Sequence, residues 1–185
     1  RVPIICGAAP SSPAIVQSAS VRMLIANPSA VRAPYPAALR AIMNLARAHE
    51  SRLWLSHWRQ IARGATPLHD LPELAARLRV ARLCVKDESQ RSPLGSFKAL
   101  GAPIALVRQI LRLHPGFEPT AVLAGRYAAK LADYTVISAT DGNHGRALAA
   151  AARDAGCRCQ IVLHAQVSLE REQAIADCGA QIVRI

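Results

Sequence analysis

The C-terminal part of the chain alternates between strand-like and helix-like segments, and this alternation limits the possible folds more than any other feature. Residues 134–139, 158–163 and 180–185 are short and rich in Val and Ile, which is typical of strands. Between them, 146–156 and 168–179 are typical of helices, and each ends at a glycine. Because the connections are short, this order predicts a parallel sheet with right-handed crossovers. The sequence therefore predicts an α/β fold in which helices flank the sheet in three layers.

The middle of the chain predicts helices and one further strand. Apolar residues recur at helical spacing in several segments, and a run of β-favouring residues follows them. The predicted elements are two helices or one broken helix over 36–52 and 52–63, a loop over 64–72, a helix over 71–80, a strand over 81–89 and a loop over 90–95. Ser96 is placed to cap a helix over 97–113. We expect Pro103 to bend this helix, because proline lacks one backbone donor.

The N-terminal stretch differs in composition from the rest. Residues 1–49 contain no Asp or Glu, and 1–22 are rich in Pro, Ser and Ala with little periodicity. This pattern fits a transit-peptide-like leader, and it equally fits untranslated codons read as protein, with a true start near Met23. Both alternatives stay open. We expect 1–22 to be poorly ordered, and we take 23–185 as one domain, because a chain of 185 residues is long enough to bury a core.

The net charge of +11 raises the question of a nucleic-acid partner. The basic residues are scattered singly, without a stripe and without interleaved aromatic residues. This pattern favours a generally basic surface over a nucleic-acid interface. No apolar run approaches the roughly 18 residues that a membrane-spanning helix needs, so no membrane segment is expected.

The five cysteines form no metal-binding pattern, because no CxxC pair occurs among them. Cys84 stands in an apolar, strand-like run. Free, buried thiols are therefore the simplest interpretation, and they suit a reducing compartment such as the cytoplasm.

Lys98 is unusual because only three of the 23 basic residues are lysines. It stands between Phe97 and a run of small apolar residues, at the start of a predicted helix. Desolvation and the positive end of a helix both favour a neutral amine, which suits a lysine that forms a Schiff base. Arginine cannot take this role. The alternative is a lysine whose stem simply lies along the helix.

A second group of polar residues stands in the segment "TDGNHG", residues 140–145. Gly142 and Gly145 permit a tight turn or a close approach to a ligand. Asp141 supplies a carboxylate, and Asn143 supplies an amide with both donors and an acceptor. A loop of this kind before a helix can hold an anion. The alternative is an Asp-Gly turn that only caps the helix.

Both segments follow a predicted strand and open a helix, which is where open parallel sheets bind ligands. The motif "KDES…R…LGSFKALG", followed after about forty residues by "ATDGNHGRALA", resembles the fold type II pyridoxal-phosphate enzymes, the family of serine and threonine dehydratases and tryptophan synthase β. Within it, the aspartate before "GNHG" is most similar to the diaminopropionate ammonia-lyases, since dehydratases more often carry a serine there. "ATPLHDLPELAARLRV" and "IADCGAQIV" resemble the flanking segments, so the resemblance covers about 23–185.

The resemblance implies roles for four residues. Lys98 would bind pyridoxal phosphate covalently, Phe97 would pack against its ring, and Asn143 would donate to its 3-oxygen. Asp141 would act as the second base, which serves the D-isomer, while Lys98 serves the L-isomer. The implied reaction is α,β-elimination of 2,3-diaminopropionate, an amino-acid substrate, to pyruvate and ammonia. A homodimer is implied as well, without a nucleic-acid partner, a membrane or a metal.

Two departures from the family stand out. The family usually has "FKALGG", and this chain has Ala102 and Pro103 there, which we expect to shift the helix beside Lys98. Relatives run to about twice this length and carry a glycine-rich phosphate loop that is not found before Ile185. We therefore expect an N-terminal part of the catalytic domain, without its C-terminal half. A serine or threonine dehydratase-like lyase, or a truncated chain without activity, remain alternatives.

Overall fold

The computed structural model describes residues 34–185. The chain divides into two compact units, Arg1–Ile42 and Met43–Ile185. In the first unit, the described residues contain helix α1 (Ala37–Ile42), whose side chains are exposed. The predictions for residues 1–22 and for a start near Met23 fall outside the described residues.

The second unit begins with helix α2 (Leu45–Ser56), which Asn44 caps by accepting from the backbone N–H of Arg47 at 2.9 Å. The helix predicted over 52–63 is confirmed only as far as Ser56, where α2 ends. After this helix, the side chains of three consecutive residues donate to Asp154, namely Trp58, Arg59 and Gln60. Three consecutive positions on a helix do not face the same way, so this shared acceptor requires an irregular backbone.

A two-stranded antiparallel sheet follows. It consists of strands β1 (Leu68–Asp70) and β2 (Cys84–Lys86), and helix α3 (Pro72–Leu78) lies between them in the sequence. The loop predicted over 64–72 is wrong at β1, because three residues are too short a run to give a periodic signal. The predicted strand over 81–89 is confirmed only at its centre. Cys84 is exposed, which contradicts the prediction of a buried thiol, since all six residues of this ladder are exposed.

The segment around Lys98 is not one bent helix. After the 3-10 helix η1 (Glu88–Arg91), a second 3-10 helix, η2 (Phe97–Leu100), precedes helix α4 (Ala102–Leu113). The predicted cap is confirmed, because Ser96 Oγ accepts from the N–H of Lys98 at 3.3 Å. The predicted bend is wrong. Pro103 lies in the first turn of α4, where its missing donor is not needed, and so it favours a helix start.

Two short helices lead into the main sheet. These are α5 (Pro119–Leu123) and α6 (Ala128–Leu131), and both contribute fully buried side chains to the core.

The C-terminal part confirms the predicted alternation. Its elements are β3 (Thr135–Ala139), α7 (Asn143–Ala155), β4 (Arg158–Leu163), α8 (Leu169–Ala176) and β5 (Gln181–Arg184). The three strands are parallel in the order β3-β4-β5. Gly156, at a φ of 88°, ends α7, and the Ser168 hydroxyl caps α8, both as predicted. Helix α7 begins at Asn143 rather than 146, so part of the expected loop is helical.

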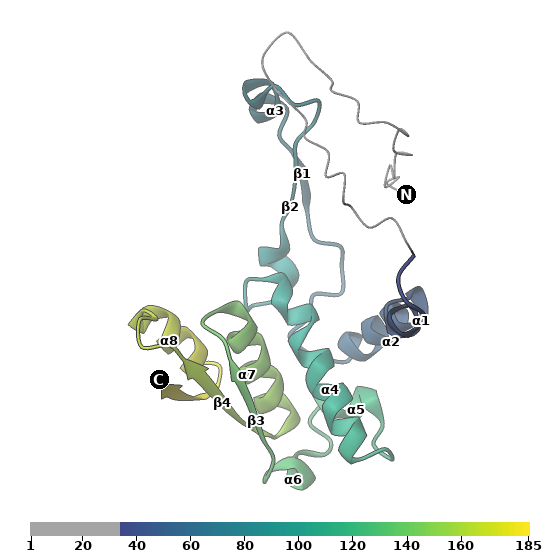
Figure 1. Cartoon of the computed structure of the whole chain (residues 1–185), viewed down its shortest axis with the longest axis vertical. Helices are drawn as coiled ribbons and strands as arrows, with labels where there is room; N and C mark the ends of the chain where they lie inside the picture. The colour runs from purple at the N-terminus through teal and green to yellow at the C-terminus, as the bar shows by residue number, and fades with distance from the viewer. Residues whose placement is uncertain (1–33) are drawn as a thin grey trace. The chain divides into compact units, whose positions relative to one another are not determined.

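The α/β fold with a parallel sheet and flanking helices is confirmed (Figure 1). Helices α7 and α8 pack on the sheet and on each other, so they cover the same face, while Ile137 on β3 is exposed. Helix α4 packs along α7 as well. Helix α7 permits this close packing because its buried face consists largely of alanines.

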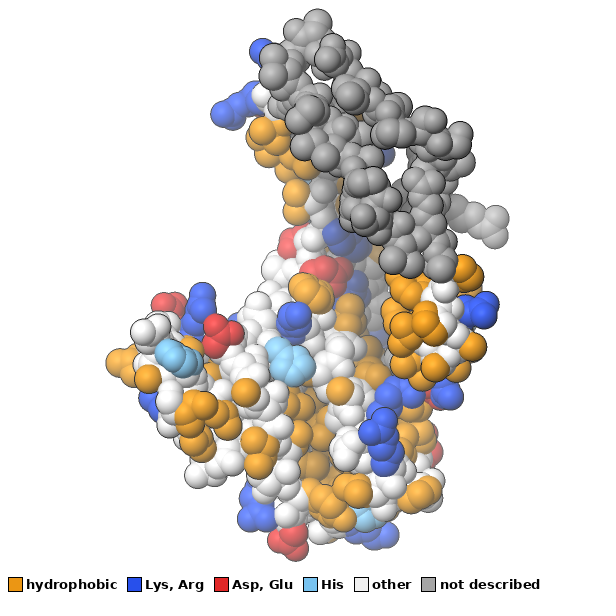
Figure 2. Space-filling model, in the orientation of Figure 1, with side chains coloured by type: hydrophobic (Ala, Val, Ile, Leu, Met, Phe, Trp, Pro, Cys, Tyr) orange, Lys and Arg blue, Asp and Glu red, His pale blue; other side chains and the backbone are white. Residues whose placement is uncertain are grey.

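Surface and thiol features complete the description. Figure 2 shows basic side chains on several parts of the face that it displays. Within residues 34–185, no helix has the length and apolarity needed to cross a membrane, and no group of three His, Cys, Asp or Glu side chains is placed to hold a metal. Cys157, Cys159 and Cys178 are free and buried, as predicted, and Cys6 lies outside the described residues.

Candidate active site

Lys98 lies on η2 with its amine exposed. Its Nζ is 4.8 Å from the centroid of the Phe97 ring, and the amine has no hydrogen bond or ion pair among residues 34–185. The expected desolvation is wrong for the described residues, because Lys98 is exposed and Phe97 is 55% exposed. The cause is the tight turn of η2, in which neighbouring side chains diverge, so that Ala99 is buried and Lys98 is not.

The second motif forms the start of α7. Gly142 precedes the helix without a side-chain capping bond, so the first N–H groups of α7 have no side-chain partner. Asn143 Oδ1 accepts from Arg146 Nη1 at 3.5 Å. Gly145 serves packing, since an added Cβ would lie 3.1 Å from Thr140 Cγ2. This end of α7 therefore offers donors to an anion.

The structure brings the two motifs to the same end of a helix pair. Helices α4 and α7 lie side by side and begin at the same end in Figure 1. The 3-10 helix η2, which carries Lys98, packs on α7. Asp141 lies two residues before the start of α7, so the amine and the carboxylate belong to neighbouring segments.

A hollow of about 490 Å³ lies beside Asp141 and Asn143. Arg146 and Arg171 also line it, and neither was singled out from the sequence. Arg171 Nη1 is 3.5 Å from Asp141 Oδ2, and both side chains are about two-thirds exposed, so this ion pair is weak. Lys98 does not line this hollow.

Arg146 carries the clearest sign of an unmet interaction near the motif. Its Nε is buried and has no hydrogen-bond partner among residues 34–185. A cation in the first turn of a helix also opposes the helix dipole, and this placement was a signal already present in the sequence. An anionic group beside Asn143 would accept a hydrogen bond from Arg146 Nε, and its negative charge would offset the unfavourable interaction of this cation with the helix dipole.

The "KDES…R" motif forms a clamp that shapes the neighbouring loop. Glu88 accepts from Arg91 at 2.9 and 3.0 Å and from the Thr66 hydroxyl at 2.5 Å. The hydrogen bonds from Arg91 are the main reason that the pKa of Glu88 falls to about 2, and the bond from Thr66 adds to them. Lys86 Nζ donates to the carbonyl of Thr66. These bonds tie η1 and β2 to the segment around Thr66.

The comparison with known protein families agrees with this geometry. The profile of the family described as pyridoxal-phosphate dependent enzyme matches residues 60–185, which include both motifs. The chain belongs to this family.

Several of the relatives that match are diaminopropionate ammonia-lyases. Diaminopropionate ammonia-lyase of Salmonella typhimurium is 34% identical over 120 residues, which are 63% of this chain and 30% of the relative. The Escherichia coli diaminopropionate ammonia lyase in its apo form superposes with a TM-score of 0.67 at 28% identity, over 78% of this chain and 39% of that one. The same enzyme in complex with D-serine gives a TM-score of 0.66 at 27% identity, over 78% and 36%. The chain therefore spans well under half the length of these relatives.

The residues present fit part of a pyridoxal-phosphate site. The fit rests on an amine without a hydrogen-bond partner beside an aromatic ring, and on an uncapped helix start with a nearby orphaned donor. Lys98, Phe97 and Asn143 are the residues that would hold the cofactor.

Proposed function

We propose that the protein containing this chain carries out a pyridoxal-phosphate-dependent α,β-elimination of 2,3-diaminopropionate to pyruvate and ammonia. The observation that supports the proposal is the packing of η2, which carries Lys98, on α7, whose start follows Asp141 by two residues. The name of the Salmonella relative supports the choice of substrate. The E. coli relative in complex with D-serine supports an amino-acid ligand.

In this proposal, some residues of the chain position the cofactor and others accept protons from the substrate. When bound, the cofactor withdraws electrons from the substrate and so makes its α-proton acidic. Lys98 holds the cofactor and takes the α-proton of the L-isomer, and Asp141 takes that of the D-isomer from the opposite face. Phe97 packs beside the ring, and Asn143 donates to its 3-oxygen. Overall, one water enters, and both nitrogen atoms of the substrate leave as ammonia.

The first test is spectroscopic. Purified protein containing this chain, mixed with pyridoxal phosphate, should develop the absorbance band of a lysine-bound cofactor, and Lys98→Ala should abolish it. Lys130→Ala is the matched control, because Lys130 is also an exposed lysine that contacts a phenylalanine ring, at 5.7 Å. A wild-type protein without the band contradicts the proposal.

The second test separates the lyase from a dehydratase-like enzyme. Asp141→Asn should remove activity on D-2,3-diaminopropionate and retain activity on the L-isomer, measured as pyruvate released. A variant that loses neither activity favours a serine or threonine dehydratase-like lyase, in which this position is not a base. Asp133→Asn, at another exposed aspartate, controls for the loss of charge.

We also propose a homodimer in a reducing compartment such as the cytoplasm. The three free, buried thiols support the compartment. Light scattering on the purified protein tests the assembly, and a monomeric mass contradicts it.

A further inference from the structure

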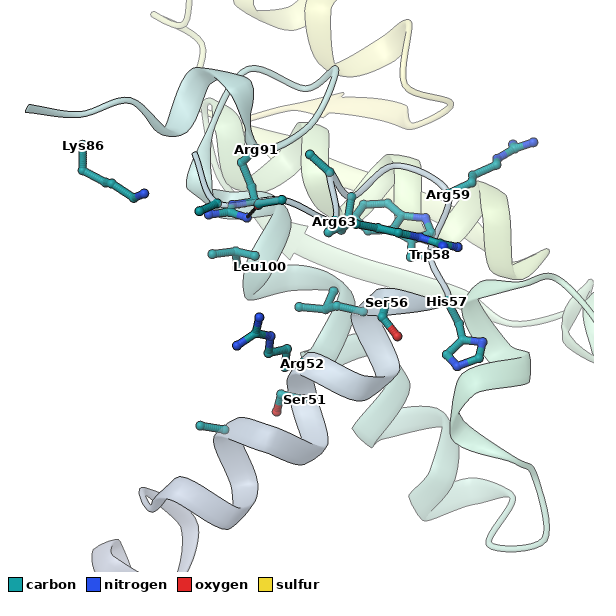
Figure 3. A pocket seen from close by; sticks show the side chains of 16 residues that line it. Ser51, Arg52, Ser56, His57, Trp58, Arg59, Arg63, Lys86, Arg91 and Leu100 are labelled. Atoms are coloured by element: carbon teal, nitrogen blue, oxygen red, sulfur yellow. Dashed lines mark hydrogen bonds between the residues drawn. The ribbon is translucent and has the colours of Figure 1, made fainter. Parts of the chain in front are cut away.

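A hollow of about 1220 Å³ opens between α2, the following loop and the segment from β2 to η2 (Figure 3). Five cationic side chains line it, and no Asp or Glu does. They are Arg52, Arg59, Arg63, Lys86 and Arg91. Lys98 and Asp141 are not part of this lining, so the hollow is distinct from the candidate active site.

Three of the cations are held in place by groups outside the lining. Arg59 Nη2 is 2.8 Å from Asp154 Oδ1, and Arg91 is paired with Glu88. Lys86 donates to a backbone carbonyl. These contacts fix the wall of the hollow without placing a carboxylate in it.

Arg52 and Arg63 have no such partner. Neither makes a hydrogen bond or an ion pair within residues 34–185, and both side chains are exposed. In Figure 3, Arg52 projects from α2 toward the wall that carries Arg91 and Leu100. Two guanidinium groups that line the same hollow are therefore unpaired within residues 34–185, and the planar fork of each suits a pair of phosphate oxygens.

Apolar side chains line the same hollow between the cations. Leu55 and Trp58 line it with side chains that are 6% and 1% exposed, and Leu100, which is 38% exposed, lines it as well. Ligand pockets in proteins commonly combine an apolar lining with a few polar anchors. The lining thus favours a ligand with an apolar body over a bare inorganic ion.

Two such hollows do not suit a face-to-face contact between copies of this chain, because their cationic linings would repel each other. The concave shape favours a small molecule, and the volume of about 1220 Å³ lies somewhat above the usual range of ligand pockets, about 300–1,000 Å³. We propose that this hollow binds an organic phosphate monoester with an apolar body, through Arg52 and Arg63.

The test is a calorimetric titration with phenyl phosphate, carried out on the full chain with Lys98→Ala so that the lysine proposed to bind the cofactor does not contribute. We expect saturable binding that is at least about tenfold tighter than that of inorganic phosphate or phenol, because only phenyl phosphate uses both the cations and the apolar lining. Absence of saturable binding, or equal affinity for inorganic phosphate, overturns the proposal.

Matched variants locate the site. In the same background, Arg52→Ala and Arg63→Ala should each weaken binding by about tenfold, as expected for a lost charge-assisted hydrogen bond. Arg77→Ala removes the same charge from an exposed position on α3, outside the hollow, and should leave the affinity within twofold. If Arg77→Ala weakens binding as much as Arg52→Ala, the binding reflects net charge alone and the proposal is wrong. The cofactor band of the protein with Lys98 is measured separately, so each proposal can fail independently.

Discussion

The indole Nε1 of Trp58 donates to Oδ2 of Asp154 at 2.9 Å, across 96 positions of the sequence. Arg59 and Gln60 donate to the same carboxylate, whose side chain is 2% exposed. This bond ties the loop after α2 to the last turns of α7. One buried carboxylate therefore positions a wall of the cationic hollow relative to the helix that begins at Asn143.

Asp154→Ala should lower the free energy of unfolding by about 2 kcal/mol, because it leaves the buried N–H of Trp58 without an acceptor. Burial by itself would raise the pKa of Asp154, but the hydrogen bonds from Arg59, Trp58 and Gln60 hold it below its usual value, so the group is charged at neutral pH. Urea denaturation measures the loss.

The control for this variant is Asp133→Ala, since Asp133 is exposed and its carboxylate makes no hydrogen bond or ion pair within residues 34–185. Its effect should stay within about 0.5 kcal/mol. Equal stability of the two variants would show that the Trp58 to Asp154 bond does not hold the loop.

Glu88 should give the protein a stability that depends on acid. Its pKa is lowered to about 2 by Arg91 and Thr66, against about 4.3 in an unfolded chain. A lowered folded-state pKa contributes stability that is present above pH ~4.3 and is lost as the pH falls toward about 2. The difference in unfolding free energy between wild type and Glu88→Gln should therefore be larger at neutral pH and shrink across this window. A difference that is constant with pH contradicts the clamp.

The thiols should differ sharply in reactivity. Burial raises the pKa of Cys157, and burial followed by the neighbouring Cys157 raises that of Cys159 to about 11, so both stay protonated and inert at pH 8. Cys84 is exposed. In a Cys6→Ser background, iodoacetamide should label Cys84 first, and the buried thiols should react only after unfolding. Peptide mapping by mass spectrometry distinguishes the sites, and early labelling of Cys159 contradicts the buried position on β4.

The sequence predicted the elements that alternate regularly between strand and helix, and the helix end that a glycine marks. The strands β3 to β5 follow from apolar composition between helices, and Gly156 marks the end of α7. The strand β1 was missed because three exposed residues carry no periodic signal. The loop after Ser56 was missed because its cause, Asp154, lies far away in the sequence.

The candidate site was predictable to a similar degree. The rule that ligands gather at the ends of parallel strands holds for Asp141 and Asn143, which follow β3. It does not hold for Lys98, because β2 pairs antiparallel with β1 outside the parallel sheet, although η2 still packs on α7. The exposure of Lys98 could not be foreseen, because it depends on the tight turn of η2 and on which neighbours cover the amine. The cationic hollow was also missed, since its residues come from segments up to about fifty positions apart.

Gly156 joins α7 to β4 and should not tolerate a side chain. Its φ is 88°, a left-handed conformation that disfavours other residues, and an added Cβ would lie 2.5 Å from the Cα of Ala128. A change from Gly to Ala usually stabilises a protein where the backbone conformation suits alanine, but here the conformation and the contact do not. Gly156→Ala should therefore lower the free energy of unfolding by more than about 1 kcal/mol. Gly116→Ala is the matched control, because a Cβ added there would meet no atom within 4 Å and the φ of Gly116 is not positive. Thermal unfolding of both variants checks the prediction, and equal melting temperatures would mean that α6 does not pack against the end of α7.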